Sequence, residues 1–331
     1  MQPMRLTILF EWLGPLGNVF ILLFSLFILD RASDLAVDNA VKVADLTGLG
    51  KTIIGFMLVA MTTTLPELSI SVLTALGVED VGVAIGNALG SNVVNICLIL
   101  GLAFLITSLK SSETYLEVKE DVETIYFGLF IASIVPLALI YLGYASRFIG
   151  VILIAIFAYN IYRASKERKG ENKTDFGEKK EKLKRLVLLT IVGVIIVVAS
   201  AYLIVDSASY IAECMGVPKV VIGATIVAFG TSLPEFANSL KSSLKGHVEL
   251  ALGNIVGSCF LDVTLILGVA LIGQNFRVNM AAYTGLAVHA LVSSLILWYF
   301  LSSKKISWKE GAILLFLYMV FLAQIFGVYR T

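Results

Sequence analysis

Residues 55–67 read GFMLVAMTTTLPE, an apolar run that ends in three threonines, a proline and a glutamate. Residues 223–235, GATIVAFGTSLPE, repeat this pattern 168 positions later, and seven of the thirteen positions are identical. A carboxylate inside a membrane span is costly unless something neutralises or uses it. Because proline removes a backbone donor and clashes with the preceding turn, we predict that each helix breaks near the hydroxyl residues. The freed carbonyls, the hydroxyls and the carboxylate are hard oxygen ligands of the kind that suits Ca2+ or Na+.

A plainer interpretation exists for one copy of the stretch. A proline kink whose hydroxyls bond to their own helix explains a single TTTLPE without any ion. Two copies, each with its own glutamate, favour an ion site.

The composition indicates a polytopic membrane protein. Of 331 residues, 58% are hydrophobic and only 15% are charged, which is more apolar surface than a soluble protein of this size can bury. The sequence therefore predicts an all-α fold with ten transmembrane helices. The ten stretches of spanning length are 10–29, 52–76, 81–107, 123–144, 147–163, 186–208, 219–241, 247–273, 281–302 and 310–327. The three cysteines are too few for a disulfide framework and are interpreted as packing residues.

Charge sets the expected orientation of these spans. The one long hydrophilic segment, 163–185, carries ten of the 25 Lys and Arg residues and is predicted to be a cytoplasmic linker. Alternation of ten spans then leaves twenty of the 25 basic residues inside and places both termini outside, as the positive-inside rule favours. Residues 30–45, polar but compatible with a helix, either prolong the first helix or lie at the membrane interface.

A second motif also occurs twice. Residues 86–95 read GNALGSNVVN and residues 253–262 read GNIVGSCFLD. The chain is therefore predicted to consist of a first repeat (1–162), the linker, and a second repeat (186–331), each with five spans. An odd number of spans inverts the second repeat, an arrangement that places ion sites at mid-membrane in many secondary transporters.

The second motif supplies further polar groups. Ser91 and Asn95 are four residues apart, as are Ser258 and Asp262, so each pair lies on one helix face. The G-x-x-x-G spacings allow close helix approach, which would bring Ser91 and Asn95 near Glu67 and would bring Ser258 and Asp262 near Glu235. Three carboxylates at one centre repel one another and require cations, protons or both.

The paired TTTLPE and GTSLPE stretches, each followed by a GN-x-x-GS block, resemble the cation/Ca2+ antiporter superfamily and in particular its prokaryotic Na+/Ca2+ exchangers. The resemblance covers nearly the whole chain. It implies a secondary active antiporter that exchanges Ca2+ for Na+ by alternating access, with spans 1 and 6 sliding across the core. It also implies Glu67 and Glu235 as central ligands shared by the Ca2+ and Na+ sites.

The resemblance also assigns the remaining ligands. Hydroxyl ligands fall on Thr63, Thr64, Thr231, Ser232, Ser91 and Ser258. Backbone carbonyls at Ala60 and Ala228 fit the outermost Na+ positions, and Asn95 and Asp262 fit the middle of the site. Thr62 departs from the family pattern, which has glycine where the second copy has Gly230.

Other functions remain open at this stage. H+ and K+ are alternative or additional coupling ions. Asp262 resembles an aspartate of K+-dependent exchangers, which keeps K+ open. The sequence has nothing like the GNAxE-type motif of the H+/Ca2+ branch, which favours Na+ over H+. A cation channel is a more distant alternative. We expect no enzyme activity, no cofactor and no nucleic-acid partner. The expected partners are Ca2+, Na+ and the lipid of the cell membrane, with the chain working as a monomer.

Overall fold

A computed structural model describes residues 11–48, 51–76, 81–110, 116–117, 123–167, 177–215, 228–273, 278–280, 283–303 and 305–328. The longer helices are α1 (Gly14–Thr47), α5 (Val81–Val93), α7 (Glu123–Leu142), α8 (Arg147–Glu167), α9 (Gly177–Cys214), α13 (Val248–Leu261), α15 (Thr284–Ser302) and α16 (Trp308–Val328). The shorter helices are η1 (Glu11–Leu13), α2 (Lys51–Ile54), α3 (Ala60–Thr63), α4 (Leu65–Ala75), α6 (Gly101–Lys110), α11 (Ala228–Thr231), α12 (Leu233–Leu244) and α14 (Leu267–Ile272). The fold is helical, as the composition predicts.

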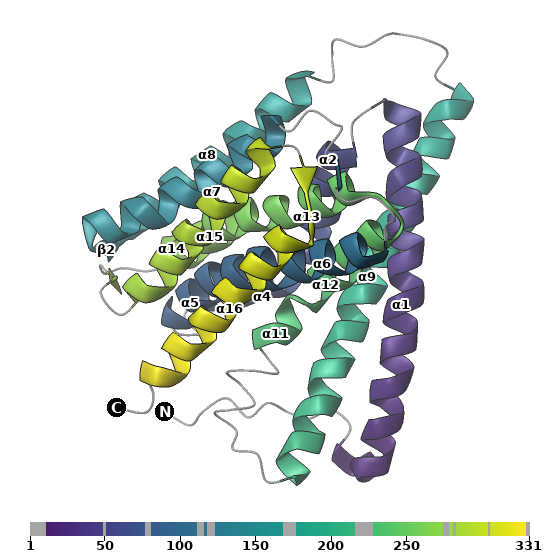
Figure 1. Ribbon diagram of the computed structural model, residues 1–331, viewed down its shortest axis with the longest axis horizontal. Helices are drawn as coiled ribbons and strands as arrows, with labels where there is room; N and C mark the ends of the chain where they lie inside the picture. The colour runs from purple at the N-terminus through teal and green to yellow at the C-terminus, as the bar shows by residue number, and fades with distance from the viewer. Residues whose placement is uncertain are drawn as a thin grey trace.

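Helices α1 and α9 form a pair at one edge of the molecule, and the remaining helices form a block beside them (Figure 1). Helix α1 has 34 residues, so the polar stretch 30–45 prolongs the first helix. The pair packs closely where Gly193 meets Ala36, because a Cβ on Gly193 would lie 2.8 Å from the Ala36 nitrogen. Helices α8 and α9 also extend into the predicted linker from both ends, and its residues 168–176 lie outside the described residues.

Both LPE helices break where the sequence predicts. Helix α3 ends at Thr63 and α4 begins at Leu65, and Thr64 between them has φ −79° and ψ 11°. Ser232 separates α11 from α12 with φ −90° and ψ 5°. Both values fall in the sparsely populated bridge region. Pro66 and Pro234 stand in the first turn of the second piece, the position at which a missing N–H does least harm.

The described residues also contain three π-helical turns. They are η2 (Gly55–Val59), η3 (Val94–Leu100) and η6 (Asp262–Ile266). A π-helical turn inserts one extra residue into a helix and re-aims the side chains beyond it. Asn95 and Asp262, equivalent positions of the two predicted repeats, both lie on such turns.

Within the described residues, four two-residue strands connect parts of the helix block. Strand β1 (Leu116–Glu117) pairs antiparallel with β4 (Lys305–Ile306), and β2 (Tyr144–Ala145) pairs antiparallel with β3 (Val278–Asn279). In Figure 1, β2 lies at the lower left end of the block and the yellow arrow of β4 lies near its top. Each pair joins a loop of the first half of the chain to a loop of the second half.

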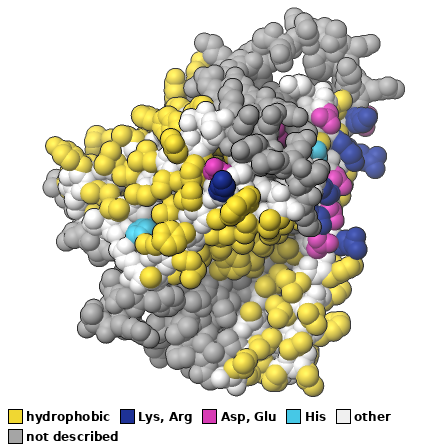
Figure 2. Space-filling view, viewed as in Figure 1, with side chains coloured by type: hydrophobic (Ala, Val, Ile, Leu, Met, Phe, Trp, Pro, Cys, Tyr) yellow, Lys and Arg dark blue, Asp and Glu magenta, His cyan; other side chains and the backbone are white. Residues whose placement is uncertain are grey.

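The surface and the core are both apolar. Four described helices are long and apolar enough to cross a membrane: Ala84–Leu109, Glu181–Ala208, Val248–Ile272 and Thr284–Ser302. Two shorter apolar helices, Tyr126–Leu142 and Arg147–Tyr162, accompany them. Hydrophobic side chains are spread widely over the described part of the face in Figure 2, and charged ones of both signs gather along the edge that α1 occupies. The main core cluster combines both halves of the chain, including Phe104 and Phe260.

Candidate ion-binding site

The two central glutamates lie in equivalent and almost fully buried places. Glu67 is in the first turn of α4 and is 2% exposed, while Glu235 is in the first turn of α12 and is 1% exposed. The positive end of each helix dipole therefore faces its own carboxylate. Oε2 of both glutamates is buried and has no hydrogen-bond partner among the described residues. A buried carboxylate oxygen without a donor is the kind of atom that a cation satisfies.

Each glutamate faces a threonine from the other half of the chain. The Glu67 side chain interacts with the hydroxyl of Thr231, and the Glu235 side chain interacts with that of Thr63. Ser258 on α13 adds a hydrogen bond, since its Oγ lies 3.4 Å from Glu235 Oε1. The expected approach of Ser258 to Glu235 is therefore confirmed, and the two LPE motifs interlock at one centre.

Asp262 faces the same centre from its π-helical turn, and Asn95 is buried on the equivalent turn of the first half. Asp262 is 1% exposed, and its charge interacts with those of Glu67 and Glu235. Neither of its carboxylate oxygens has a hydrogen-bond partner within the described part of the chain. Asn95 is 2% exposed, its Oδ1 is likewise unpartnered there, and its amide contacts Cys259.

The hydroxyls of the site differ in whether they have a hydrogen-bond partner within the described residues. Thr63 Oγ1 lies 3.1 Å and Thr64 Oγ1 lies 3.0 Å from the carbonyl oxygen of Ala60, which the backbone nitrogen of Thr64 also reaches at 3.1 Å. The Ala60 carbonyl thus accepts up to three donors and would have to release some of them to bind Na+. Ser232 Oγ is buried without a partner among the described residues, and Ser91 on α5 is also buried. Ala228 opens α11, and the preceding residues 216–227 lie outside the described residues.

Carboxylates alone do not complete a metal site here. Within the described residues, no group of three or more His, Cys, Asp or Glu side chains has the spacing that a single metal ion needs. An ion held by Glu67 and Glu235 would therefore take its remaining ligands from hydroxyls and carbonyls, with Asp262 to one side. Such a mixed oxygen set is what Ca2+ and Na+ accept.

Glycine permits the close crossing that joins the two halves. A Cβ on Gly257 of α13 would lie 2.7 Å from Ala60 Cβ and 2.8 Å from the Phe56 carbonyl oxygen. A Cβ on Gly55 would collide with the Leu250 carbonyl of α13. The second G-x-x-x-G motif therefore packs on the first broken helix. Around Gly86 and Gly90 nothing described lies within 4 Å of an added Cβ, so the matching prediction for the first motif stays a prediction.

Thr62, the departure from the glycine pattern, does not offer its hydroxyl to the site. Its Oγ1 lies 2.8 Å from the carbonyl oxygens of both Leu58 and Val59 in its own helix. The extra hydroxyl is thus satisfied within its own helix, next to the break.

Asn254 is a site residue that the sequence analysis missed. Its Nδ2 lies 2.8 Å from Ser239 Oγ and 3.5 Å from the Glu235 carbonyl oxygen, and its Oδ1 lies 3.4 Å from Thr63 Oγ1. Because a carbonyl can only accept, the NH2 end must face α12 and the oxygen must face Thr63. Asn254 thus positions a hydroxyl of one motif against the glutamate helix of the other. Its place in the repeated GN pair, opposite Asn87, was the available signal.

We expect Asn254→Ala to weaken Ca2+ activation of transport about tenfold. The change leaves the buried Ser239 hydroxyl and Glu235 carbonyl without their donor, which costs about 1–3 kcal/mol. The measurement is the Ca2+ concentration dependence of uptake by purified, reconstituted protein. Ser239→Ala, which removes only one partner of the amide, is the matched control and should have a smaller effect. An unchanged Ca2+ dependence in Asn254→Ala would show that the amide does not position the site.

Comparison with known proteins identifies the family of this chain. The family model described as sodium/calcium exchanger protein matches residues 17–166 and 185–327. The sodium/calcium exchanger MaX1 of Methanosarcina acetivorans is 27% identical over 94% of this chain and 99% of its own length. The uncharacterized membrane protein MJ0091 of Methanocaldococcus jannaschii is 30% identical over 92% of this chain and 96% of its own.

A solved structure shares the fold. The sodium-calcium exchanger NCX_Mj, soaked with 10 mM Na+ and zero Ca2+, superposes with a TM-score of 0.80 at 28% identity, over 92% of this chain and 98% of that one. The protein is therefore a multi-pass membrane transporter and not an enzyme, and it belongs to the sodium/calcium exchanger family.

Proposed function

We propose that this protein exchanges Ca2+ for Na+ across the cell membrane by alternating access. One observation carries the proposal: two buried glutamates from opposite halves of one chain each face the other half's threonine, and each keeps one oxygen without a described partner. Two carboxylates balance one Ca2+, and the same oxygens with their hydroxyls offer places for Na+. Because both glutamates come from one chain, the monomer is sufficient.

The predicted architecture supplies the mechanism. We infer ten spans in two inverted repeats, 1–162 and 186–331, joined by the cytoplasmic linker 163–185 with both termini outside. Each strand pair joins a loop of one half to a loop of the other, which supports placing the two loops of each pair on the same membrane side. Lys241 and Lys245 lie against Asp30, Asp34 and Asp38, which supports placing residues 30–45 and the end of α12 on the same membrane side.

The test is Ca2+ uptake into vesicles that contain the purified protein. Vesicles preloaded with Na+ should take up Ca2+, and vesicles preloaded with K+ alone or with only a proton gradient should not. Uptake that needs no opposing Na+ gradient would contradict the proposal. A proton gradient that drives uptake would indicate H+ as the counter-ion, and Ca2+ movement without any coupled ion would indicate a channel.

Asp262 favours a role for a monovalent ion as well. Its counterpart Asn95 is neutral, so the site holds at most three negative charges, of which one Ca2+ balances two. An unpaired charge in a buried place is costly, so Asp262 should associate with a monovalent cation or a proton while Ca2+ is bound. This is the specific observation behind K+ dependence as the second candidate.

We therefore expect Asp262→Asn to retain measurable Na+-driven Ca2+ exchange, because both central glutamates remain. If K+ stimulates the wild type, the substitution should remove that stimulation, since a neutral amide no longer offers the extra charge. The assay is Na+-driven Ca2+ flux with and without K+ for both proteins. Complete loss of Ca2+ flux in a folded Asp262→Asn protein would instead identify Asp262 as a primary Ca2+ ligand.

A further inference from the structure

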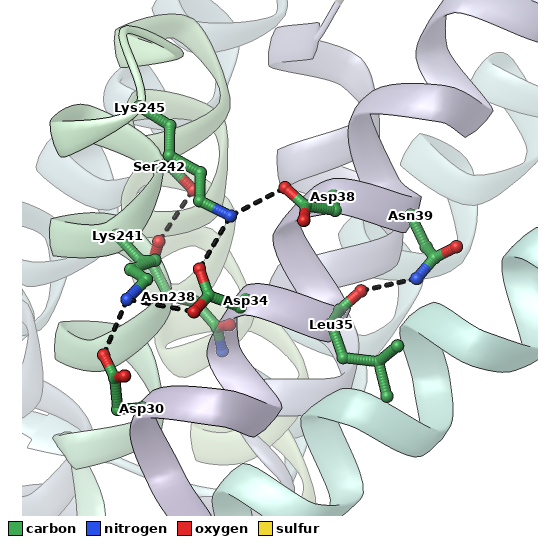
Figure 3. Close-up of polar contacts among 9 residues, drawn as sticks. All are labelled: Asp30, Asp34, Leu35, Asp38, Asn39, Asn238, Lys241, Ser242 and Lys245. Carbon is green, nitrogen blue, oxygen red and sulfur yellow. Dashed lines mark hydrogen bonds and ion pairs between the residues drawn. The ribbon is translucent and has the colours of Figure 1, made fainter. Parts of the chain in front are cut away.

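Lys241 of α12 and Lys245, the residue that follows the end of α12, reach three aspartates of α1 in a regular ladder (Figure 3). Lys241 Nζ lies 2.6 Å from Asp30 Oδ1 and 3.2 Å from Asp34 Oδ2. Lys245 Nζ lies 2.7 Å from Asp34 Oδ1 and 2.7 Å from Asp38 Oδ1. These five side chains are called the aspartate–lysine ladder below. Its members are spaced four residues apart on both helices, so each acid and each lysine stands one turn from the next.

The ladder is a connected network and not a set of isolated surface pairs. Asp34 is shared by both lysines and its side chain is 29% exposed, against 54% for Asp30 and 52% for Asp38. Burial alone would raise the pKa of Asp34, but hydrogen bonds from Lys245 and Lys241 hold it below its ordinary value. Without the lysines, three stacked aspartates would repel one another along α1. Single exposed pairs are worth little, whereas a network of this kind can hold a register.

The ladder connects two parts that the proposed mechanism requires to move relative to each other. Helix α1 packs chiefly on α9 at the edge of the molecule. Helix α12 carries Glu235 in its first turn, six residues before Lys241. The ladder therefore links the edge pair directly to the helix of a central glutamate.

Because the spacing is regular, the ladder can re-form after a slide of one turn. Four residues of helix rise about 6 Å along the axis. If α1 moves by this distance in its own N-to-C direction, Lys245 faces Asp30 and Asp34, and Lys241 faces Asp30 and Leu26. Three of the four ion pairs form again with new partners.

A slide in the opposite direction would also form three ion pairs, but it would add a repulsive contact between two lysines. Lys241 would then face Asp34 and Asp38, but Lys245 would face Asp38 and Lys42, which occupies the next position of the four-residue series. Two lysines would meet where the observed register has a lysine and an aspartate. One-turn steps of one element past another are an established form of two-state transition. The charges thus permit two registers and oppose a third.

We infer that the aspartate–lysine ladder is a register latch, which holds α1 at two positions one turn apart along α12 and so couples the movement of α1 to Glu235. The inference rests on the proposed function, since the two registers would correspond to two access states. It differs from a merely structural contact because it specifies the step length and the direction of the step.

The test measures the register directly by electron–electron double resonance in lipid nanodiscs. Spin labels are placed at Leu16 of α1, 87% exposed, and Leu244 of α12, 39% exposed, after Cys214→Ser removes the exposed native thiol. Leu16 lies about 33 Å along the α1 axis from Asp38, so a slide changes the label distance almost fully. Four labelled proteins are compared in Na+ and in Ca2+. They are the parent, the double variant Lys241→Met/Lys245→Met, Lys42→Asp, and Asp45→Asn. Asp45→Asn is the matched control because it changes an α1 acid outside the ladder.

The parent and Asp45→Asn should show two distances, the second about 6 Å shorter, with populations that respond to the ion. The double methionine variant should show one broad distribution, and Lys42→Asp should gain a population about 6 Å longer than the observed register. If the double variant does not fold, Asp34→Asn, which removes only the shared carboxylate, should broaden both distances.

Three results would overturn the latch. The labelled parent could show a single distance in both ions, the double methionine variant could keep both distances unchanged, or Lys42→Asp could fail to gain the additional, longer distance. The exchange proposal is tested separately, by Na+-driven Ca2+ uptake with the same labelled parent. Two latch distances in a protein without exchange would reject the exchange proposal and support the latch. Exchange with a single, ladder-independent distance would reject the latch alone.

Discussion

We expect that Glu67→Gln and Glu235→Gln each abolish Na+-driven Ca2+ uptake while the protein still folds. Each glutamate is buried at the break of its helix and has one oxygen without a described donor. Glutamine keeps the size of the side chain but removes one of the two charges that oppose a divalent ion. Removing one partner of a buried charge pair costs about 3–5 kcal/mol, which corresponds to a loss of ion affinity of about 100-fold or more.

The measurement is the initial rate of Ca2+ uptake by purified protein that elutes as a single species. Thr62→Val is a matched control, since it alters a side chain of the same motif whose hydroxyl bonds only to its own helix. It should keep most of the activity. A normal rate in either glutamine variant would remove the carboxylate pair from the centre of the mechanism.

The centre of this site was predictable because its chemistry is conspicuous in apolar sequence. A proline must break a helix, and a glutamate in a span must be used or neutralised, so Pro66 with Glu67 and Pro234 with Glu235 identify the break and the ligand together. The structure confirms the break at Thr64 and at Ser232. The repeat strengthened the prediction, because each motif tests the other.

The parts that could not be predicted depend on contacts between the two motifs. Nothing in the local pattern shows that Thr63 faces Glu235 and not the glutamate of its own helix. The π-helical turns at Asn95 and Asp262 escape periodicity arguments, since one inserted residue changes the phase of a helix without changing its composition. Asn254 resembles an ordinary packing residue until its three hydrogen-bonding neighbours are known.

Residues 30–45 show that contacts between distant segments could not be predicted at the surface of the protein either. Their charges left two possibilities, a longer helix or an interfacial segment, because helical propensity does not depend on what the aspartates face. The structure makes them part of α1, and the lysines that pair with them lie more than 200 positions further along the chain. Acids repeated every four residues do not by themselves show what they contact. Here they pair with two lysines that have the same four-residue spacing at the end of α12.

We expect the second largest effect from Gly257→Ala, a change of one methyl group. The added Cβ would meet Ala60 Cβ at 2.7 Å and the backbone of Phe56 at 2.8 Å, and neither is the end of a flexible side chain that could turn away. Forcing extra atoms into such a crossing costs about 1–3 kcal/mol. The strain acts where α13, which carries Ser258, lies on the broken helix that leads to Thr63 and Glu67.

Because the two half-sites are held together at this crossing, Gly257→Ala should lower the exchange rate at least about tenfold and also lower the temperature of unfolding. Gly285→Ala on α15 is the matched control, since its Cβ meets only the flexible end of Gln324, at 2.8 Å. A compensating Ala60→Gly change, which removes the methyl group in the way, should restore part of the rate in the Gly257→Ala background without any new ligand. Thermal unfolding and uptake are measured on all four proteins. If Gly257→Ala has the same exchange rate and the same unfolding temperature as Gly285→Ala, the crossing is looser than these distances indicate and does not hold the two glutamates in register.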